Sequence, residues 1–559
     1  MNRQTSRNFI NIAIGVIIGI ATATGFFIVS DRTITVETLA EAEKIIDIEF
    51  TDAEREQMLE NVQQGSETYA AVRDLEMAND VPFPLYFNPI PPGKVIDLGE
   101  QQEINWNIPD DVNLPENRAD LAFYTVHELS SLIKNRKITS VELTEFFLNR
   151  LKEHNPKLEA VVTFTEERAL DQAKKMDEEL DQGNYRGPLH GIPYGAKDLF
   201  AVEGYPTTWG ATPYKDQTID ETATVVKKLD DAGAVLIAKT TLGALAYGDI
   251  WFDGRTNNPW NLEQGSSGSS AGSSAATAAG LLPFSLGTET LGSIVSPSTR
   301  NGVTGLRPTF GRVSRHGAMA LSWTMDKVGP ITRTVEDAAM VFDVIRGTDH
   351  LDHTVMDFPF NYNHSVDLSE LKIGYVEDAF AGDYEQSEMD NEVLNVLKDL
   401  GAELVPISLP ELPLNGMFNV LTAEGAAAFD ELTLSGQDST MVWQEDNAWP
   451  NSFRSVRFLP AVEYIQLNRI RSLLIQQMDE AIADVDVYVS PSFRGGNLLI
   501  TNLTGHPSVV LKHGFSEENQ PSSITFIGHL FDEATLIAVA EAYQKATDFH
   551  NMHPPLFSE

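Results

Sequence analysis

Two stretches of the chain share one pattern, in which a predicted helix ends at a glycine and leads into a run of apolar and β-branched residues. TATVVKKLDDAGAVLIAKT (222–240) breaks at Gly233, and DNEVLNVLKDLGAELVPISL (390–409) breaks at Gly401. Glycine adopts the left-handed backbone that ends many helices. An apolar strand without polar alternation is typical of a sheet that is buried on both faces. The sequence therefore predicts an α/β fold with helices on both faces of a β-sheet.

A serine-rich stretch, GSSGSSAGSSAATAAG (265–280), resembles a flexible linker in composition alone. Its alanines, however, run directly into the apolar segment LLPFSL, which favours a tightly packed helix that leads into the core. Residues 268–272 also match the G-x-S-x-G nucleophile elbow, which would make Ser270 a nucleophile. That motif needs a strand directly before it, and the preceding RTNNPWNLEQ is rich in turn formers instead.

Three ordered segments resemble the amidase signature family of amide hydrolases. They are GIPYGAKDLF (191–200), GSSAGSSAATAAG (268–280) and GTETLGSIVSPSTRNGVTGLRPTFGRVSRHG (287–317). The likeness extends from about Tyr124 to the closing FIGHLFDEATLIAVAEAYQKATDFHNMHP. It implies a large mixed β-sheet covered by helices on both faces, and an enzyme that cleaves carboxylic amides through a serine–cis-serine–lysine triad.

The resemblance assigns the triad to three residues of this chain. It makes Ser293 the nucleophile, Ser269 the bridging serine and Lys197 the base, with a cis peptide bond between Gly268 and Ser269. The chemistry is consistent, because a serine hydroxyl attacks well only after a base takes its proton. No histidine stands at a plausible position in these segments, so a lysine is the available base. Burial would keep its amine neutral.

The backbone N–H groups before the nucleophile are the expected oxyanion hole, at Thr290, Leu291 and Gly292 with Ser293 itself. Two positions depart from the family pattern. Leu291 stands where the family usually has a glycine, and Val295 stands where it usually has an arginine. Because valine cannot bind a carboxylate, we expect neutral or hydrophobic amides to be preferred, unless Arg300 compensates.

Aromatic residues of the C-terminal half could rim such a site, although an ordinary core role is at least as plausible for them. These residues are Trp443, Trp449, Phe453 and Phe458.

Composition excludes several classes of function. The chain has no cysteine, so thiolate catalysis, disulfides and cysteine metal sites are excluded, and no HExxH motif is present. We therefore expect neither a metal nor another cofactor. The 81 acidic and 40 basic residues give a formal net charge of −41, which repels a phosphate backbone and argues against a nucleic-acid partner.

The N-terminus predicts export. Arg3 and Arg7 precede an uncharged run from Phe9 to Val29 that is long enough to span a bilayer. An uncleaved signal anchor is the first interpretation; a cleaved signal peptide and a buried core helix are the alternatives. The remainder would then lie on the periplasmic or extracellular face, attached to the membrane or released.

The predicted domains are this segment (1–30), a helical and proline-rich extension (31–119) and the catalytic domain (120–559). Within the extension, Thr51 and Glu54 form a capping box, and VPFPLYFNPIPPG (81–93) interrupts the helical pattern.

Three functions remain open. The leading one is an amidase that acts on a small-molecule amide through an acyl-enzyme. The second is the A-type subunit of an amidotransferase, which would release ammonia from glutamine. The third is an inactive, membrane-tethered interaction protein. The sequence leaves the oligomeric state open, with a homodimer as one option.

Overall fold

The computed structural model of the chain describes residues 34–74 and 77–558. The predicted anchor or signal segment, residues 9–29, lies outside the described residues and stays a prediction. Within the described ranges, no helix combines the length and the apolar character that a membrane span requires.

The chain divides into two compact units, residues 1–76 and 77–559. The described part of the first unit holds α2 (Val36–Ile46) and α3 (Asp52–Arg73). The predicted capping box is confirmed at the start of α3, where Thr51 N–H donates to Glu54 Oε2 at 2.7 Å and Glu54 N–H donates to Thr51 Oγ1 at 3.4 Å. The proline-rich residues 81–93 belong to the second unit, and the domain boundary expected after residue 119 stays a prediction.

The second unit is built on an 11-stranded sheet. Strand β2 runs parallel to β3 and β8, β11 runs parallel to β12 and β13, and the other neighbours are antiparallel, so the sheet is mixed as the resemblance implied. The strands in sheet order are β1 (Val161–Phe164), β3 (Val235–Thr240), β2 (Pro193–Lys197), β8 (Phe284–Glu289), β10 (Lys327–Thr332), β9 (Thr304–Arg307), β14 (Ser508–Phe515), β15 (Pro521–Gly528), β13 (Val487–Pro491), β11 (Lys372–Val376) and β12 (Glu403–Ile407). Two small sheets pair β4 (Ile250–Trp251) with β5 (Gly254–Arg255) and β6 (Asn257–Asn258) with β7 (Asn261–Gly265).

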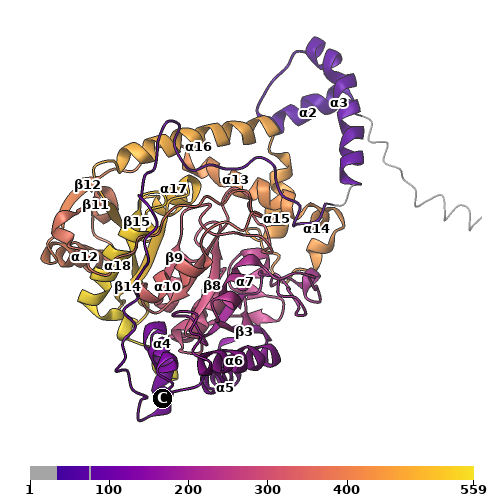
Figure 1. Cartoon of the computed structure of the whole chain (residues 1–559). Helices are drawn as coiled ribbons and strands as arrows, with labels where there is room; N and C mark the ends of the chain where they lie inside the picture. Colours follow the sequence, from indigo (N-terminus) through magenta and orange to yellow (C-terminus); the bar gives the residue numbers. More distant parts are fainter. Residues whose placement is uncertain (1–33, 75–76, 559) are drawn as a thin grey trace, which may run out of the picture. The chain divides into compact units, whose positions relative to one another are not determined.

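Helices surround this sheet (Figure 1). The α-helices of the second unit are α4 (Val126–Lys134), α5 (Ser140–Leu158), α6 (Glu166–Asp181), α7 (Thr224–Asp231), α8 (Ala271–Ala278), α9 (Val295–Asn301), α10 (Val335–Ile345), α11 (Glu377–Phe380), α12 (Ser387–Asp399), α13 (Leu414–Ala428), α14 (Asp430–Leu434), α15 (Trp449–Ser455), α16 (Ala461–Ala481), α17 (Asn497–Thr504) and α18 (Glu533–Thr547). Helices α8 and α9 pack on each other and on the central strands, and α10 and α18 form a second such pair on the same strands. This arrangement is that of a sheet between two helical layers.

Both helix–glycine–strand units predicted from the sequence are present. Helix α7 leads through Gly233, with φ +87°, into β3, and α12 leads through Gly401, with φ +97°, into β12. Strand β3 is buried along its whole length, as predicted. The expectation of a second fully buried strand is wrong: β12 is at the end of the sheet, where only Ile407 among its residues is buried.

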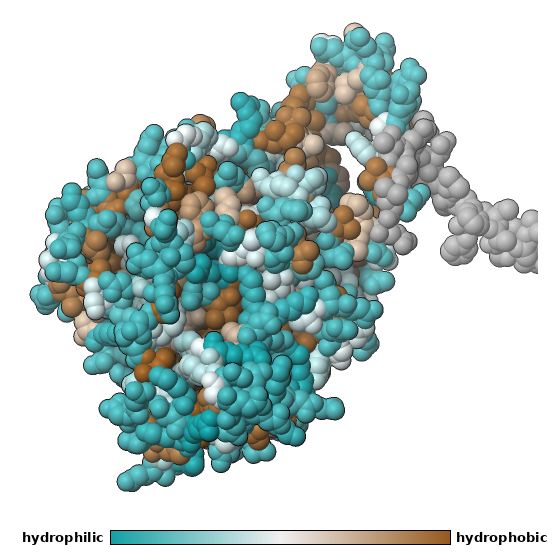
Figure 2. Space-filling model, viewed as in Figure 1, coloured by the Kyte–Doolittle hydropathy of each residue, from teal (hydrophilic) through white to brown (hydrophobic). Residues whose placement is uncertain are grey.

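Residues 77–117, here called the strap, precede α4 and run over the second unit with little regular structure (Figure 1). Figure 2 shows hydrophilic residues over most of the visible face, interrupted by smaller hydrophobic areas. This face is therefore mostly solvated.

Candidate active site

Lys197 is the last residue of β2, and the parallel neighbour β8 ends at Glu289. Ligands of α/β sheets bind at the carboxyl ends of parallel strands, where loops replace the sheet. The Lys197 side chain is closed to solvent at this edge. The strands in two of the segments that carry the resemblance therefore end at one place in the fold.

The serine-rich stretch reaches the same edge. The structure has the cis peptide bond between Gly268 and Ser269 that the resemblance implied. Residues 271–278 form α8, and every one of them is buried, so the packed-helix interpretation is confirmed and the linker interpretation is wrong. A Cβ atom at Gly272 would lie 2.2 Å from the carbonyl oxygen of Ala160, which explains why the helix needs glycine there.

The amine of Lys197 contacts three hydroxyl groups. Its Nζ lies 2.7 Å from Ser269 Oγ, 2.9 Å from Thr288 Oγ1 and 3.2 Å from Ser270 Oγ. Burial lowers the pKa of Lys197 to about 7, although the charges of Asp326 and Glu289 favour the protonated form. A substantial fraction of the amine is therefore neutral at neutral pH, which general-base catalysis requires.

Ser293 lies in the loop between β8 and α9, here called the nucleophile loop (residues 290–294). Its side chain is nearly buried, and its carbonyl oxygen accepts a hydrogen bond of 3.2 Å from Ser270 N–H. In the described part of the chain, no hydrogen bond joins the hydroxyls of Ser269 and Ser293. The backbone N–H groups of Leu291, Gly292 and Ser293 have no acceptor among the described residues, so they can serve an oxyanion.

Glu289 holds the end of the nucleophile loop, and the sequence analysis did not identify it. Its Oε2 accepts from the N–H groups of Ile294 and Val295 at 2.8 and 2.9 Å. Its Oε1 lies 2.6 Å from Arg307 and accepts from Asn502 at 2.8 Å. Burial alone would raise the pKa of this carboxyl, but Arg307 and the backbone donor outweigh burial and lower the pKa to about 2.

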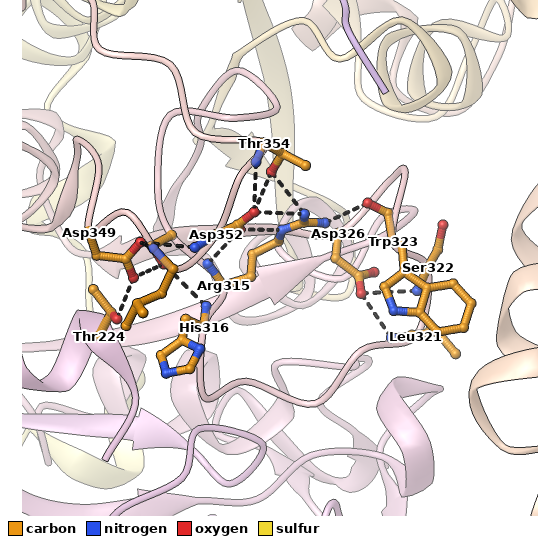
Figure 3. A network of polar contacts seen from close by, with 12 residues as sticks. Thr224, Arg315, His316, Leu321, Ser322, Trp323, Asp326, Asp349, Asp352 and Thr354 are labelled. Carbon is orange, nitrogen blue, oxygen red and sulfur yellow. Dashed lines mark hydrogen bonds and ion pairs between the residues drawn. The ribbon is translucent and has the colours of Figure 1, made fainter. Parts of the chain in front are cut away.

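Asp326 holds the other end of the same loop and was also missed. Its Oδ1 accepts from Thr290 Oγ1 at 2.6 Å, and its Oδ2 accepts from the N–H groups of Leu321 and Ser322 at 2.8 and 3.0 Å. Figure 3 shows Asp326 with its carboxylate directed at the backbone of Leu321 and Ser322. The sequence offered one possible signal of these two roles, which was the position of Glu289 and Asp326 in or near the segments that carry the resemblance.

A small cavity adjoins Thr288 and Thr290, beside the amine of Lys197 and the nucleophile loop. It is lined by Leu199, Ala246, Thr288, Thr290, Arg315, Ala318, Met319, Leu321, Asp326, Lys327 and Val328. Its walls are mainly apolar, and its volume of about 10 Å³ has room for about one water molecule, so an acyl group could enter it only if part of the wall moved.

The two basic side chains that line this cavity already contact protein groups. Arg315 donates to Asp352 at 2.9 Å and to the carbonyl oxygen of Trp323 at 2.7 Å, as Figure 3 shows. Lys327 donates to the carbonyl oxygen of Met325, and burial lowers its pKa well below the usual value. Neither group is therefore preorganised for a substrate carboxylate.

The positions that depart from the family pattern are also placed. Val295 is buried, with its N–H on Glu289. Arg300 is exposed and donates to Gln264 at 3.0 Å, so it does not replace the missing arginine in this structure. Leu291 is partly buried and packs against the core without lining the cavity.

Of the two roles open to the four aromatic residues, the core role is confirmed for Trp449 and Phe453. Trp449 and Phe453 are buried and stack on each other at 4.9 Å, as ordinary core residues do. Phe458 is exposed, and Trp443 stacks on Tyr247 at 4.9 Å. Trp449 Nε1 also donates to the Leu245 carbonyl oxygen at 2.9 Å, so Trp443 and Trp449 both lie beside the segment that reaches the cavity at Ala246.

The elbow interpretation of Ser270 finds no support. Strand β7 ends at Gly265 and does not lead directly into the motif. The Ser270 side chain is completely buried, and its hydroxyl accepts from Thr288 N–H at 3.2 Å and contacts Lys197. Its place is that of a packing and positioning group.

One group of side chains in the described ranges is close enough to share a metal ion: Glu336, His364 and Glu541. His364 Nδ1 lies 3.3 Å from Glu336 Oε1, and Glu541 accepts from Lys545 and from the hydroxyl of Tyr362. Protein donors and cations thus already satisfy these carboxylates, and the group shares no residue with the Lys197 site.

Comparison with known proteins adds independent findings. The Amidase family model matches residues 142–498. The A-type subunit of the glutamyl-tRNA(Gln) amidotransferase of Moorella thermoacetica is 32% identical over 491 residues, which cover 78% of this chain and 99% of that protein. The solved peptide amidase of Stenotrophomonas maltophilia has a TM-score of 0.68 and 27% identity, covering 77% of this chain and 98% of its own. The solved A-type subunit of the corresponding Thermotoga maritima amidotransferase has a TM-score of 0.63 and 25% identity, covering 76% and 95%.

Proposed function

The chain belongs to the amidase family and is an enzyme that acts on C–N amide bonds, and we propose that it hydrolyses amides of uncharged acyl groups through an ester on Ser293. The observation that carries this proposal is the buried, easily neutralised amine of Lys197 at 2.7 Å from Ser269 Oγ, beside the nucleophile loop.

Acylation follows from this arrangement. Neutral Lys197 takes the proton of Ser269, and Ser269 takes the proton of Ser293 as Ser293 Oγ attacks the amide carbon. The Ser269–Ser293 hydrogen bond is expected to close when substrate enters, since catalytic contacts are often long without it. The N–H groups of Leu291, Gly292 and Ser293 stabilise the oxyanion. The C–N bond then breaks, and the leaving nitrogen takes the proton back through Ser269.

Deacylation uses the same groups in reverse. A water molecule gives a proton through Ser269 to Lys197 and attacks the ester carbon. The ester C–O bond breaks, Ser293 regains its proton, and the carboxylic acid leaves. The overall reaction consumes one water and yields one acid and one amine or ammonia.

The preference for an uncharged acyl group rests on the cavity. Its walls are largely apolar, Arg315 is already paired with Asp352, and burial favours the neutral amine of Lys327 by lowering its pKa. A carboxylate placed there would lose its hydration and find no unpaired positive charge, which is costly. Val295 is a buried apolar residue and supplies none.

Release of ammonia from glutamine, as one component of an amidotransferase, is the second candidate. The observation that favours it is the 32% identity to the Moorella thermoacetica protein over 99% of that protein. This function would add protein partners. The cavity chemistry and the net charge of −41, which repels tRNA, argue against it.

One substrate comparison separates the two functions. The purified chain is assayed for release of ammonia from glutamine and from matched primary amides that end in a carboxylate or in its methyl ester. We expect kcat/KM to favour the methyl ester by about tenfold or more. A tenfold preference for the acid, or efficient ammonia release from glutamine alone, would overturn the proposal in favour of the second candidate.

A further inference from the structure

The strap forms hydrogen bonds with one of the loops that line the cavity. This pocket loop comprises residues 318–323. Asn79 binds its centre from both sides of the amide: Asn79 Oδ1 accepts from Ala320 N–H at 2.9 Å, and Asn79 Nδ2 donates to the Ala320 carbonyl oxygen at 2.9 Å. A side-chain amide that bonds to both the N–H and the C=O of one residue pairs with it as a neighbouring strand would. It thereby fixes the position and orientation of that residue's backbone.

Two further strap residues support the C-terminal end of the same loop. The ring of Phe83 lies 5.5 Å from the ring of Trp323. The ring of Phe87 lies 3.6 Å beneath the guanidinium of Arg471, which in turn donates to the hydroxyl and carbonyl oxygens of Thr324 at 2.8 and 2.9 Å. The strap therefore contacts the pocket loop directly and its C-terminal neighbour through Arg471.

The pocket loop is coupled to the candidate active site in two ways. Met319 and Leu321, the residues on either side of Ala320, line the cavity. The N–H of Leu321 also donates to Asp326, whose other oxygen accepts from Thr290 at the start of the nucleophile loop. A shift of Ala320 would thus change the cavity wall and loosen the support of Thr290.

We propose that Asn79 and Phe83 are positioning residues that set the size of the acyl pocket through the pocket loop. Both lie outside the residues that the family model matches, which begin at 142. In this proposal the strap tunes which acyl group is accepted. This inference rests on the proposed function and specifies its substrate selectivity.

The test compares Asn79→Ala with a matched control, Gln101→Ala. Gln101 makes the same two-sided contact elsewhere on the strap: its Oε1 accepts from Phe360 N–H at 2.8 Å, and its Nε2 donates to the Phe360 carbonyl oxygen at 3.0 Å. Both variants remove one amide that anchors the strap to the body. Only the Asn79 variant removes the anchor of Ala320, which lies between two residues that line the cavity.

The readout is acyl selectivity, the ratio of kcat/KM for a bulky and a short acyl group on one leaving amine. We expect Asn79→Ala to shift this ratio by about tenfold toward the bulky acyl group, since one methylene in a pocket is worth that much or more. Gln101→Ala should keep the wild-type ratio. An unchanged ratio in Asn79→Ala, or an equal shift in both variants, would overturn the inference.

Hydrogen exchange gives a second readout that needs no turnover. The N–H groups of Leu321 and Ser322 should exchange faster in Asn79→Ala than in Gln101→Ala, because the loop that presents them to Asp326 loses its anchor. Equal exchange in the two variants contradicts the inference. If Asn79→Ala fails to fold, Phe83→Leu takes its place in both measurements. Wild-type protein that hydrolyses no amide would instead contradict the proposed function and leave the exchange comparison valid.

Discussion

Glu289 and Arg307 form an ion pair of 2.6 Å that solvent does not reach. Glu289 is the last residue of the strand that leads into the nucleophile loop. Its second carboxylate oxygen accepts hydrogen bonds from the two N–H groups that follow Ser293. The pair therefore connects the sheet to the loop that must present the nucleophile. Its charge is needed because an arginine buried without a partner is unstable.

Replacing Glu289 with Gln should lower the free energy of unfolding by about 3–5 kcal/mol, because Arg307 then keeps a buried, uncompensated charge. Urea unfolding measures this loss. The same variant should react more slowly with a serine-directed fluorophosphonate probe. Glu533→Gln is the control, since Glu533 forms an equally buried pair of 3.0 Å with Arg312 away from the nucleophile loop. It should lose similar stability and keep the wild-type labelling rate, and equal labelling losses in both variants would argue against the role of Glu289.

Ser293→Ala should abolish turnover and probe labelling while the melting temperature stays near the wild-type value, because only one hydroxyl leaves a loop. Ser269→Ala should be severe but less complete, since Lys197 and the oxyanion donors remain. The fluorophosphonate probe also tests whether the protein is an inactive interaction protein, because labelling at Ser293 requires a working site. Near-native turnover of the Ser293 variant is the result that this mechanism does not allow.

Lys197→Ala should slow acylation by at least ~10², the usual scale of general-base catalysis. Wild-type kcat/KM should fall with decreasing pH, with an apparent pKa near 7, because the base works only when neutral and its protonated fraction grows below its own pKa of about 7. Stopped-time assays from pH 5 to pH 9 in both proteins measure the effect. An acid limb that persists unchanged in the variant would assign the titration to another group.

The segment from Phe9 to Val29 should direct the chain to the membrane, with residues after 30 on the outer side, because Arg3 and Arg7 precede the apolar run. Protease added to intact spheroplasts of an expressing bacterium should degrade the enzyme. Removal of residues 1–30 should leave it inside and protected. Protection of the full-length chain until the cells are lysed would contradict the predicted orientation.

The sequence predicted correctly those features of the fold that depend on a few neighbouring residues. The capping box at Thr51, the helix stop at Gly233 and the packed helix after Ser270 were all readable, since each depends on a few neighbouring residues. The burial of β12 was not, because a strand's place at the edge of a sheet depends on pairing over long distances. The choice between a rim and a core role for Trp449 and Phe453 stayed open for the same reason, because burial depends on distant parts of the chain.

The candidate site divides in the same way. The triad residues stand in contiguous motifs, so a resemblance could assign them. Glu289 stands in the same motif, but its partner Asn502 comes from α17, and nothing in the local sequence pairs them. Asp326 likewise gains its meaning only when Thr290 and the pocket loop meet on either side of it. Support of the nucleophile loop is therefore a property of the fold rather than of a motif.

The pairing of β9 with β14 places Gly305 beside Val510. It joins the part of the sheet that runs from β1 to β9 to the part that runs from β14 to β12. Asn502, which binds Glu289, also comes from this late part of the chain. A ribosome thus makes the lysine, both serines and the nucleophile loop long before it makes the strand and the amide that hold them in place. Nascent chains and prematurely terminated products carry all three proposed triad residues, but we expect them to be inert and hydrolysis to begin only once synthesis is nearly finished.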